Sequence, residues 1–524
     1  MMTFARKLLV ALATLASLCA QAQYESSSVN LPGGTEAFEP GFDLDGDGRN
    51  DLLVVFQRRI LVFFQKENGA FSPAPDVEIG AGAPIPDSYA AITLGKLTGD
   101  HGMQLALIGP EGVDYLTMAQ LHAQPTQPVE PRELMRRHFS ITPGPNLQYL
   151  SSAVDFDGSG RTALVLPNSD QIEVYRPNGE GRYVSAGRAY MPQQTIQRTA
   201  LRAEPSLLGS FFFGENSPQN IVQLLPRLDR WLGIQFAVEV SSEPFLVVDY
   251  NQDKRLDIIT GSRVLYQNAQ GGFVSQASGI YTQIATAYTF QKQRLVAAPN
   301  LVDINGDGIL DTFSVQTNTA KMSPRTDVSI FLGKPDRTFN KEPDFVLRTR
   351  DFAYSEAIPI GDIDLDGAQD MALIHLDFQA SSASSQLKAY LRNGLDGELC
   401  FYLWDKRRNR YPEAYSFKHP VLLSYEIYGA RQLFQQQIVI NQDMDGDGFP
   451  DLVMKSGAQQ ISIFKNQGAR KGFSSKPMTT IPTPTRFSSL LVQDLNGDKK
   501  GDIIVSGYLD DQEDRIIYTF FMSK

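Results

Sequence analysis

The chain has 524 residues, of which 42% are hydrophobic and 20% are charged, a balance typical of a folded protein rather than a disordered one. Its formal net charge of −11 argues against nucleic acid or an anionic membrane surface as a partner.

Residues 1–22 are predicted to be a secretory signal peptide. Arg6 and Lys7 precede an apolar stretch from Leu8 to Leu18, and Ala20-Gln21-Ala22 forms a small-x-small site with cleavage expected after Ala22. No later segment reaches the roughly 18 to 20 uncharged residues that a membrane helix needs. We therefore expect an exported mature chain, residues 23–524, in the periplasm, outside the cell or at the cell surface.

Cleavage of this segment would leave Cys400 as the single cysteine, so no internal disulfide is expected to hold the mature chain together. Another kind of cross-link is required.

Six copies of one phrase, Asp-x-Asp/Asn-x-Asp-x-x-x-Asp followed by an apolar run, supply hard oxygen ligands. Three copies contain four Asp and three contain three, so together they hold 21 of the 59 acidic residues. At positions one, three, five, seven and nine the copies read Asp43, Asp45, Asp47, Arg49 and Asp51; Asp249, Asn251, Asp253, Arg255 and Asp257; Asp303, Asn305, Asp307, Ile309 and Asp311; Asp362, Asp364, Asp366, Ala368 and Asp370; Asp443, Asp445, Asp447, Phe449 and Asp451; and Asp494, Asn496, Asp498, Lys500 and Asp502.

This ligand pattern predicts calcium. Calcium takes six to eight oxygens, and a tight loop offers them best from alternate residues. Positions one, three, five and nine would supply side chains, while the variety of residues at position seven is expected if only its backbone carbonyl binds. Magnesium is less suitable because it gives up its waters reluctantly. We predict about four to six bound calcium ions.

Position six separates stronger from weaker loops. Four copies have Gly there, where a sharp turn requires positive φ, whereas Lys254 and Lys499 occupy it in the loops that begin at Asp249 and Asp494. These two loops therefore rank below the other four. An EF-hand is excluded because it needs Glu at position twelve and a following helix, and here strand-like runs follow.

The spacing of the phrases predicts a ring of repeated sheets. Successive copies after Asp249 are separated by 54, 59, 81 and 51 residues, and weaker copies fill the first gap. These are Thr98–Asp100, Asp155–Gly160 (with Ala163 at position nine) and a trace at 216–220. Each unit reads as four short strands, so we predict an all-β fold: a single β-propeller of about eight blades, with seven and nine open. An N-terminal strand would complete the last blade.

The interval from Asp362 to Asp443 is about 25 residues longer than the others. It contains a low-complexity stretch, Gln379–Gln386, and a basic aromatic segment, Trp404–Tyr411. We predict an exposed insertion around 379–432, whose cationic and aromatic groups could engage an acidic glycan or protein.

Two segments, Ile360-Gly361-Asp362-Ile-Asp364-Leu-Asp366-Gly367 and Asp443-Met-Asp445-Gly-Asp447-Gly448, resemble the FG-GAP or VCBS repeat family, the calcium-loop propellers that include the head of integrin α subunits. The resemblance covers essentially all of the mature chain. It implies calcium at the positions given above, and roles in adhesion, surface recognition or carbohydrate binding.

No catalytic motif stands out. The five histidines show no metal-ligand spacing, and the chain has no nucleophile elbow or phosphate-binding loop. The leading hypothesis is therefore a non-enzymatic recognition, adhesion or scaffold module that binds a protein or glycan on a propeller face. The alternative is a secreted carbohydrate-active enzyme, a polysaccharide lyase or hydrolase, on the same scaffold. A purely structural part of an envelope assembly is a third possibility.

Overall fold

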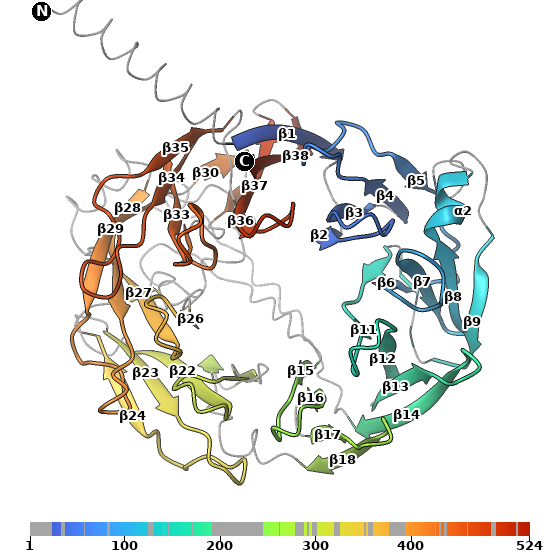
Figure 1. The fold of residues 1–524 in the computed structure, drawn as a ribbon, viewed down its shortest axis with the longest axis horizontal. Helices are drawn as coiled ribbons and strands as arrows, with labels where there is room; N and C mark the ends of the chain where they lie inside the picture. The colour runs from blue at the N-terminus through green and yellow to red at the C-terminus, as the bar shows by residue number, and fades with distance from the viewer. Residues whose placement is uncertain are drawn as a thin grey trace, which may run out of the picture.

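The apolar run after each Asp-rich phrase forms the second strand of a four-stranded antiparallel sheet. In the computed structural model eight such sheets stand side by side in a closed ring (Figure 1). The structure describes residues 24–32, 37–56, 58–80, 84–123, 130–139, 141, 143–144, 146–168, 171–190, 245–260, 263–277, 288–290, 293–295, 301–318, 325–349, 353–354, 360–376, 394–424, 426–428, 431–433, 438–457, 459–483, 489–509 and 512–524.

The sheets are the blades of a β-propeller, numbered here in chain order. Blades 1 to 4 comprise β2 (Ala37–Phe42), β3 (Asp51–Phe56), β4 (Arg59–Phe63) and β5 (Val77–Ile79); β6 (Ala91–Gly95), β7 (Gln104–Gly109), β8 (Gly112–Thr117) and β9 (Arg132–Arg136), with β10 (Gln148–Tyr149) parallel to β6; β11 (Ala153–Val154), β12 (Ala163–Asn168), β13 (Gln171–Pro177) and β14 (Tyr183–Tyr190); and β15 (Leu246–Val248), β16 (Asp257–Thr260), β17 (Arg263–Gln267) and β18 (Phe273–Ala277).

Blades 5 to 8 repeat the pattern. They comprise β21 (Leu301–Val302), β22 (Asp311–Asn318), β23 (Arg325–Phe331) and β24 (Phe345–Arg348); β25 (Ala353–Tyr354) and β26 (Ile360–Gly361) beside β27 (Asp370–Leu376), then β28 (Gly394–Tyr402) and β29 (Phe417–Ser424); β32 (Ile438–Val439), β33 (Leu452–Gly457), β34 (Gln460–Phe464) and β35 (Thr479–Pro482); and β36 (Ser489–Gln493), β37 (Asp502–Leu509), β38 (Gln512–Ser523) and β1 (Tyr24–Pro32).

Three small elements lie outside this pattern. The short helix α2 (Met118–Ala123) follows β8 in blade 2, and two hairpins pair β19 (Tyr288–Phe290) with β20 (Gln293–Leu295) and β30 (Glu426–Tyr428) with β31 (Arg431–Leu433). No helix in the described part of the chain is long and apolar enough to cross a membrane.

Blade 8 closes the ring by joining the two ends of the chain. The strand β1 pairs antiparallel with β38 from Tyr24 opposite Ser523 to Pro32 opposite Arg515. This confirms both the expected N-terminal strand in the last blade and the prediction of eight blades. The additional trace that we noted at 216–220 lies outside the described residues.

The core is distributed between the blades rather than gathered in one place. Eight clusters of buried side chains fill the eight interfaces between neighbouring blades. Alternate residues of one strand serve opposite interfaces: Leu53 and Val55 pack toward blade 2, whereas Leu52 and Val54 pack toward blade 8. Because both faces are buried, second strands such as β3 and β7 contain continuous apolar runs.

Part of the segment that we expected to be an exposed insertion belongs to blade 6. Residues 394–424 contain β28 and β29, its two outer strands, and the turn between them. Trp404 and Tyr411 are buried, at 4% and 3% exposure, against Phe345 of blade 5. Gln379–Gln386 lies outside the described residues.

Ring closure can be tested by weakening the interface between blades 8 and 1. Phe520 is fully buried there, with its ring 4.6 Å from that of Phe71. We expect Phe520→Ala to destabilise the fold by about 3–5 kcal/mol, because it removes buried area and leaves a cavity. Leu491→Ala, at a 37% exposed position of β36, is the control and should change stability by less than about 1 kcal/mol. Equal losses of thermal stability in the two variants would contradict this account.

Candidate metal centres

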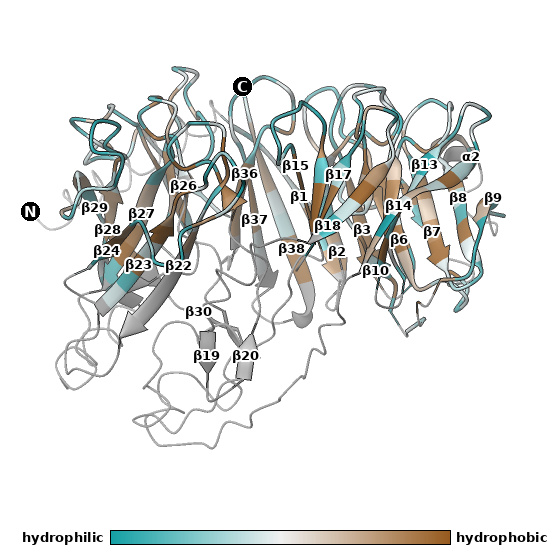
Figure 2. Cartoon of the chain, turned by 90° about the horizontal axis from the view of Figure 1, so that it is seen from below, coloured by the Kyte–Doolittle hydropathy of each residue, from teal (hydrophilic) through white to brown (hydrophobic). Residues whose placement is uncertain are grey.

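The Asp-rich phrases occupy equivalent places in the ring. Each forms the connection between the first and second strands of its blade, which we call the A–B loop. These loops lie on one edge of the ring, which is largely hydrophilic (Figure 2). The weaker copies lie at the same place in blades 2 and 3, between β6 and β7 and between β11 and β12. Repetition in sequence therefore becomes an array of loops on one face.

The Asp at position one shapes each loop from inside. In blade 7 Asp443 Oδ1 accepts a hydrogen bond from Gly446 N at 2.7 Å and Oδ2 accepts one from Gly448 N at 2.5 Å. Positions three and five each accept the N–H two residues further on, as Asp445 does from Asp447 at 3.2 Å. These Asx turns bend the chain so that alternate side chains face the centre of the loop.

Position six adopts positive φ in all six loops, as the pattern of glycines predicts. Its φ is 68° at Lys254 and 69° at Lys499, close to the 81–90° of the four glycines. Both lysines are therefore held in the left-handed region, which costs roughly 1 kcal/mol for a residue with a Cβ. This geometry agrees with the lower rank of their loops.

Position four also has positive φ, a requirement that we did not infer from the sequence. Glycine occupies it in four loops, but Gln252 (φ 61°) and Leu365 (φ 58°) stand there in the other two. The mixture of residue types hid the shared backbone conformation.

Position nine is the most buried of the acidic positions in each loop. Asp451 has no exposed surface; its Oδ2 accepts a hydrogen bond from Met444 N at 3.0 Å and its Oδ1 accepts one from Asn466 N at 2.8 Å. Asn466 begins the connection between the third and fourth strands, the C–D turn. The same pair of bonds recurs at Asp51, Asp257, Asp311, Asp370 and Asp502. One carboxylate thus joins the A–B loop to the C–D turn in five blades, and in blade 8 Asp502 joins its loop to the end of β38.

Burial controls the titration of these carboxyls. Desolvation raises the pKa of Asp51, Asp311 and Asp370 to about 7 and that of Asp257 and Asp451 to about 6, and it raises the pKa of Asp502. The neighbouring carboxylates at positions three and five act in the same direction at Asp51, Asp370 and Asp451. A nearby cation would reverse both effects.

Three loops bring carboxylates together tightly enough to hold a metal ion. In each, one oxygen from positions one, three and nine lies within 4.8 Å of the other two, in Asp43, Asp45 and Asp51; Asp362, Asp364 and Asp370; and Asp443, Asp445 and Asp451. These are the three loops with four Asp. The donor set is all oxygen and carries three negative charges, which fits calcium.

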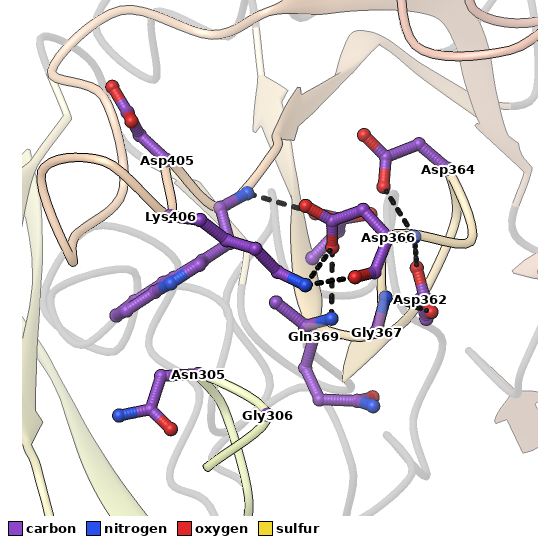
Figure 3. A network of polar contacts seen from close by, with 12 residues as sticks. Asn305, Gly306, Asp362, Asp364, Asp366, Gly367, Gln369, Asp405 and Lys406 are labelled. Carbon is purple, nitrogen blue, oxygen red and sulfur yellow. Dashed lines mark hydrogen bonds and ion pairs between the residues drawn. The ribbon is translucent and has the colours of Figure 1, made fainter.

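Basic side chains approach the loop carboxylates from the C–D turns. Lys465 Nζ pairs with Asp445 and lies 2.8 Å from Asp447 Oδ2. Lys406 Nζ lies 3.6 Å from Asp366 Oδ1 and donates to the Asp366 carbonyl (Figure 3). Within the A–B loop of blade 1, Arg49 at position seven pairs with Asp47. These ion pairs are partly exposed and worth little individually.

The three Asn-containing loops keep the backbone pattern. The amide of Asn251 donates to Asp253 at 2.9 Å, and Asn305 and Asn496 make the equivalent bonds. Each side-chain carbonyl stays available as a neutral oxygen ligand. The position-seven residues Arg255, Ile309 and Lys500 donate their N–H groups to position five, and their predicted role as carbonyl ligands stays a prediction.

Blades 2 and 3 retain the loop shape without the full ligand set. In blade 2, Gln104 takes the place of the position-nine Asp. Its Oε1 accepts hydrogen bonds from the backbone N–H groups of Leu97 and Thr98 in its own loop, at 2.7 and 3.0 Å, as Asp311 does from the same positions of its loop. In blade 3 Asp155 accepts from Gly160 at 2.8 Å, but Ala163 stands at position nine. Neither blade offers three converging carboxylates.

Two of the five histidines contact polar groups of other residues. His101 Nδ1 contacts the Asp45 carbonyl at 3.0 Å and His375 Nε2 contacts the Tyr402 hydroxyl at 3.1 Å.

The sheets and loops define an eight-bladed β-propeller with Asp-rich A–B loops. Three parts of the chain, residues 43–106, 303–373 and 443–505, match the family described as FG-GAP-like repeat. A comparison with curated protein sequences finds no significant match.

Two solved structures extend over comparable lengths. One is an Agrocybe aegerita lectin that recognises non-reducing terminal N-acetylglucosamine, at 12% identity and a TM-score of 0.33, covering 87% of this chain and 98% of the lectin. The other is a Bacillus licheniformis rhamnogalacturonan lyase, at 11% identity and a TM-score of 0.37, covering 95% of this chain and 75% of the lyase. Similarities this low carry no information on function.

Two substitutions in one loop can distinguish the structural role of position nine from the purely calcium-dependent role expected at position three. Asp451→Asn places an amide donor against one of two backbone N–H groups, so we expect a loss of about 1–3 kcal/mol with or without calcium. Asp445→Asn, at a partly exposed position, should remove only the stabilisation that calcium adds. Thermal unfolding in chelator and in calcium measures both, and equal behaviour of the two variants in chelator would refute the distinction.

The raised pKa values predict a pH dependence that calcium reverses. In the metal-free protein, groups whose pKa is raised to about 6 or 7 stabilise the fold fully below pH 4, and this contribution is lost as the pH rises through 6 to 7. The difference in Tm between calcium and chelator should therefore grow from pH 5 to pH 8. A difference that is constant over this range would contradict the assignment.

Proposed function

We propose that this protein is an exported, calcium-binding propeller that acts as a non-enzymatic recognition module. The observation that carries the proposal is the convergence of three carboxylates in each of three A–B loops, all on the same face of the ring. Carboxylates held this close repel one another unless a cation lies between them. A mature chain of residues 23–524 is part of the proposal.

The ligands would come from this chain's own loops. In the loops that begin at Asp43, Asp362 and Asp443, the side chains at positions one, three, five and nine and the carbonyl at position seven would hold one ion each. The loop at Asp303, with Gly308 at position six, is the next candidate, followed by those at Asp249 and Asp494. Calcium supplies positive charge to these carboxylates, and Lys406 and Lys465 would then lose their partners in the loops.

Bound calcium would act as a cross-link within each blade. Position nine already connects the A–B loop with the C–D turn through backbone hydrogen bonds. An ion that engages the same carboxylate adds RT ln(1 + [Ca]/Kd) of stability per site if only the folded chain binds it. This is the role that disulfides take in many other exported proteins.

Recognition is the role that best fits a rigid ring whose loops gather on one face. Binding to an array of glycans, set beside lyase and hydrolase assays on polymeric substrates, tests this role. We expect binding without turnover. Catalytic turnover of any substrate would contradict the proposal and indicate a carbohydrate-active enzyme instead. A purely structural component would show neither binding nor turnover.

Calcium itself is the most direct test of the loop chemistry. We expect the Tm to rise with added calcium and to fall with chelator, with about 1.4 kcal/mol per site at a tenfold excess over Kd. Isothermal titration should count four to six ions, and magnesium should be the weaker ligand. The triple variant Asp45→Asn, Asp364→Asn, Asp445→Asn should lose most of the rise. A Tm indifferent to calcium and chelator would refute the metal assignment.

A further inference from the structure

Two C–D turns differ sharply in charge from their counterparts in the ring. In blade 6, residues 403–416 contain four Lys or Arg and two Asp or Glu, and in blade 7, residues 465–478 contain four Lys or Arg and no acidic residue. The equivalent connection in blade 5, residues 332–344, has three of each sign, and in blade 1, residues 64–76 have one Lys against two acids. The excess is therefore a property of these two blades, not of the repeat.

The turn of blade 6 holds its cations on a fixed backbone. Asp405 Oδ1 accepts N–H bonds from Arg407 at 3.0 Å and Arg408 at 3.2 Å, and Asp405 N donates to Arg410 O at 3.0 Å. Two residues anchor its base. The backbone N–H of Trp404 donates to Asp370 Oδ1, and the hydroxyl of Tyr411 donates to Gln369 O at 2.8 Å. The base is buried while the tip is exposed.

The turn of blade 7 lies directly against the turn of blade 6. The rings of Phe417, at the start of β29, and Phe473 are 6.0 Å apart. Gly472 has positive φ, and a Cβ there would come within 2.4 Å of the Phe417 ring, so the backbone approaches this ring closely. Arg470 and Lys471 directly precede Gly472 in the chain, so these two cations belong to the part of the blade 7 turn that contacts blade 6.

Most of these cations have no acidic partner. Arg407, Arg410, Arg470, Lys471 and Lys476 are exposed and make no ion pair with the described residues. Arg408 has only a distant partner, Asp405, at 3.7 Å. We call these six side chains the basic rim: Arg407, Arg408, Arg410, Arg470, Lys471 and Lys476. By contrast, Lys406 and Lys465 point inward to the A–B loops.

One aromatic ring accompanies the basic rim. Tyr415 is 41% exposed, and Lys418 Nζ lies 5.7 Å from its centre. Among the described residues it is the sole exposed large hydrophobic side chain in either turn. A protein partner would require an apolar centre in the interface, which this surface lacks. A chain of charged sugars is bound by several exposed cations and by an aromatic ring on which a sugar can stack, and the two turns offer both kinds of group.

We propose that the basic rim binds an anionic polysaccharide, one that carries carboxylate or sulfate groups along its length. The proposal rests on the proposed recognition function and names its ligand class and its surface. Since the overall charge is −11, a polyanion would approach best at exposed cations without acidic partners, and the two turns of blades 6 and 7 carry such cations. Guanidinium groups on a fixed turn pair with carboxylate or sulfate oxygens at a low cost in side-chain entropy.

The test uses the full chain with dextrans that share one backbone. Carboxymethyl dextran, dextran sulfate and unmodified dextran of equal length are titrated in 1 mM calcium at low and high salt, conditions chosen on the order of those for extracellular calcium modules. We expect the charged forms to bind, the unmodified form not to bind, and affinity to fall steeply with salt. The two charged forms distinguish carboxylate from sulfate as the preferred group.

Matched variants locate the site. Arg407→Ala, Arg410→Ala, Arg470→Ala and Lys471→Ala combined should weaken binding by at least about tenfold. The control, Lys66→Ala, Arg182→Ala, Lys341→Ala and Arg348→Ala combined, removes the same charge from exposed positions in other blades and should leave affinity within about twofold. Both should keep the wild-type Tm, since all eight side chains are exposed.

Three results would overturn the inference. Absence of binding to both charged dextrans, in a protein that calcium still stabilises, removes it and leaves the proposed calcium-binding function standing. Full affinity in the rim variant shows that the site lies elsewhere. Equal or tighter binding of polyglutamate or a DNA duplex, lost in the same variant, assigns the rim to an acidic protein or nucleic acid instead.

Discussion

The hydrogen bonds of the buried carboxylate at position nine are the interaction on which the six blades with a complete Asp-rich loop depend. In five of them it lies where the A–B loop and the C–D turn meet, and it satisfies one backbone N–H from each. A carboxylate with two N–H donors is stabilised as an anion, but burial and the neighbouring Asp side chains oppose that charge. A cation among the loop carboxylates, as proposed above, would oppose this unfavourable contribution of burial and like charge.

Neighbouring loops also touch around the ring, so the blades are joined at this face as well as through their cores. Met103 N donates to Leu44 O across blades 1 and 2, Gln369 N to Ile304 O across blades 5 and 6, and Gly501 N to Asp443 O across blades 7 and 8. In each case the donor is position eight of one loop and the acceptor is position one or two of the loop before it. Ordering one loop therefore restricts the next.

Much of this could be predicted from the sequence, because spacing and alternation are local properties. The period of 50 to 60 residues predicted the ring, and the short C-terminal unit predicted its closure by β1. The alternation of Asp predicted carboxylates that converge, and three loops show such convergence at positions one, three and nine. The turn of blade 6 was taken for part of an insertion because the interval from Asp362 to Asp443 is longer than the others. The hydrogen bonds of position nine were invisible because Asp51 and Gln65 are far apart in sequence, and positive φ at position four was hidden by Gln252 and Leu365.

The pairing of β1 with β38 has a consequence for the order of folding. The residues that meet there, such as Ser28 and Thr519, are separated by 491 positions along the chain. The first strand to be synthesised must therefore wait for the last, and seven blades can assemble while the ring is still open. Contacts this distant in sequence form slowly, and until they form the outer edge of β38 is an unpaired strand edge, open to pairing with another chain. The final step of folding is thus also the one at which this protein is most exposed to aggregation.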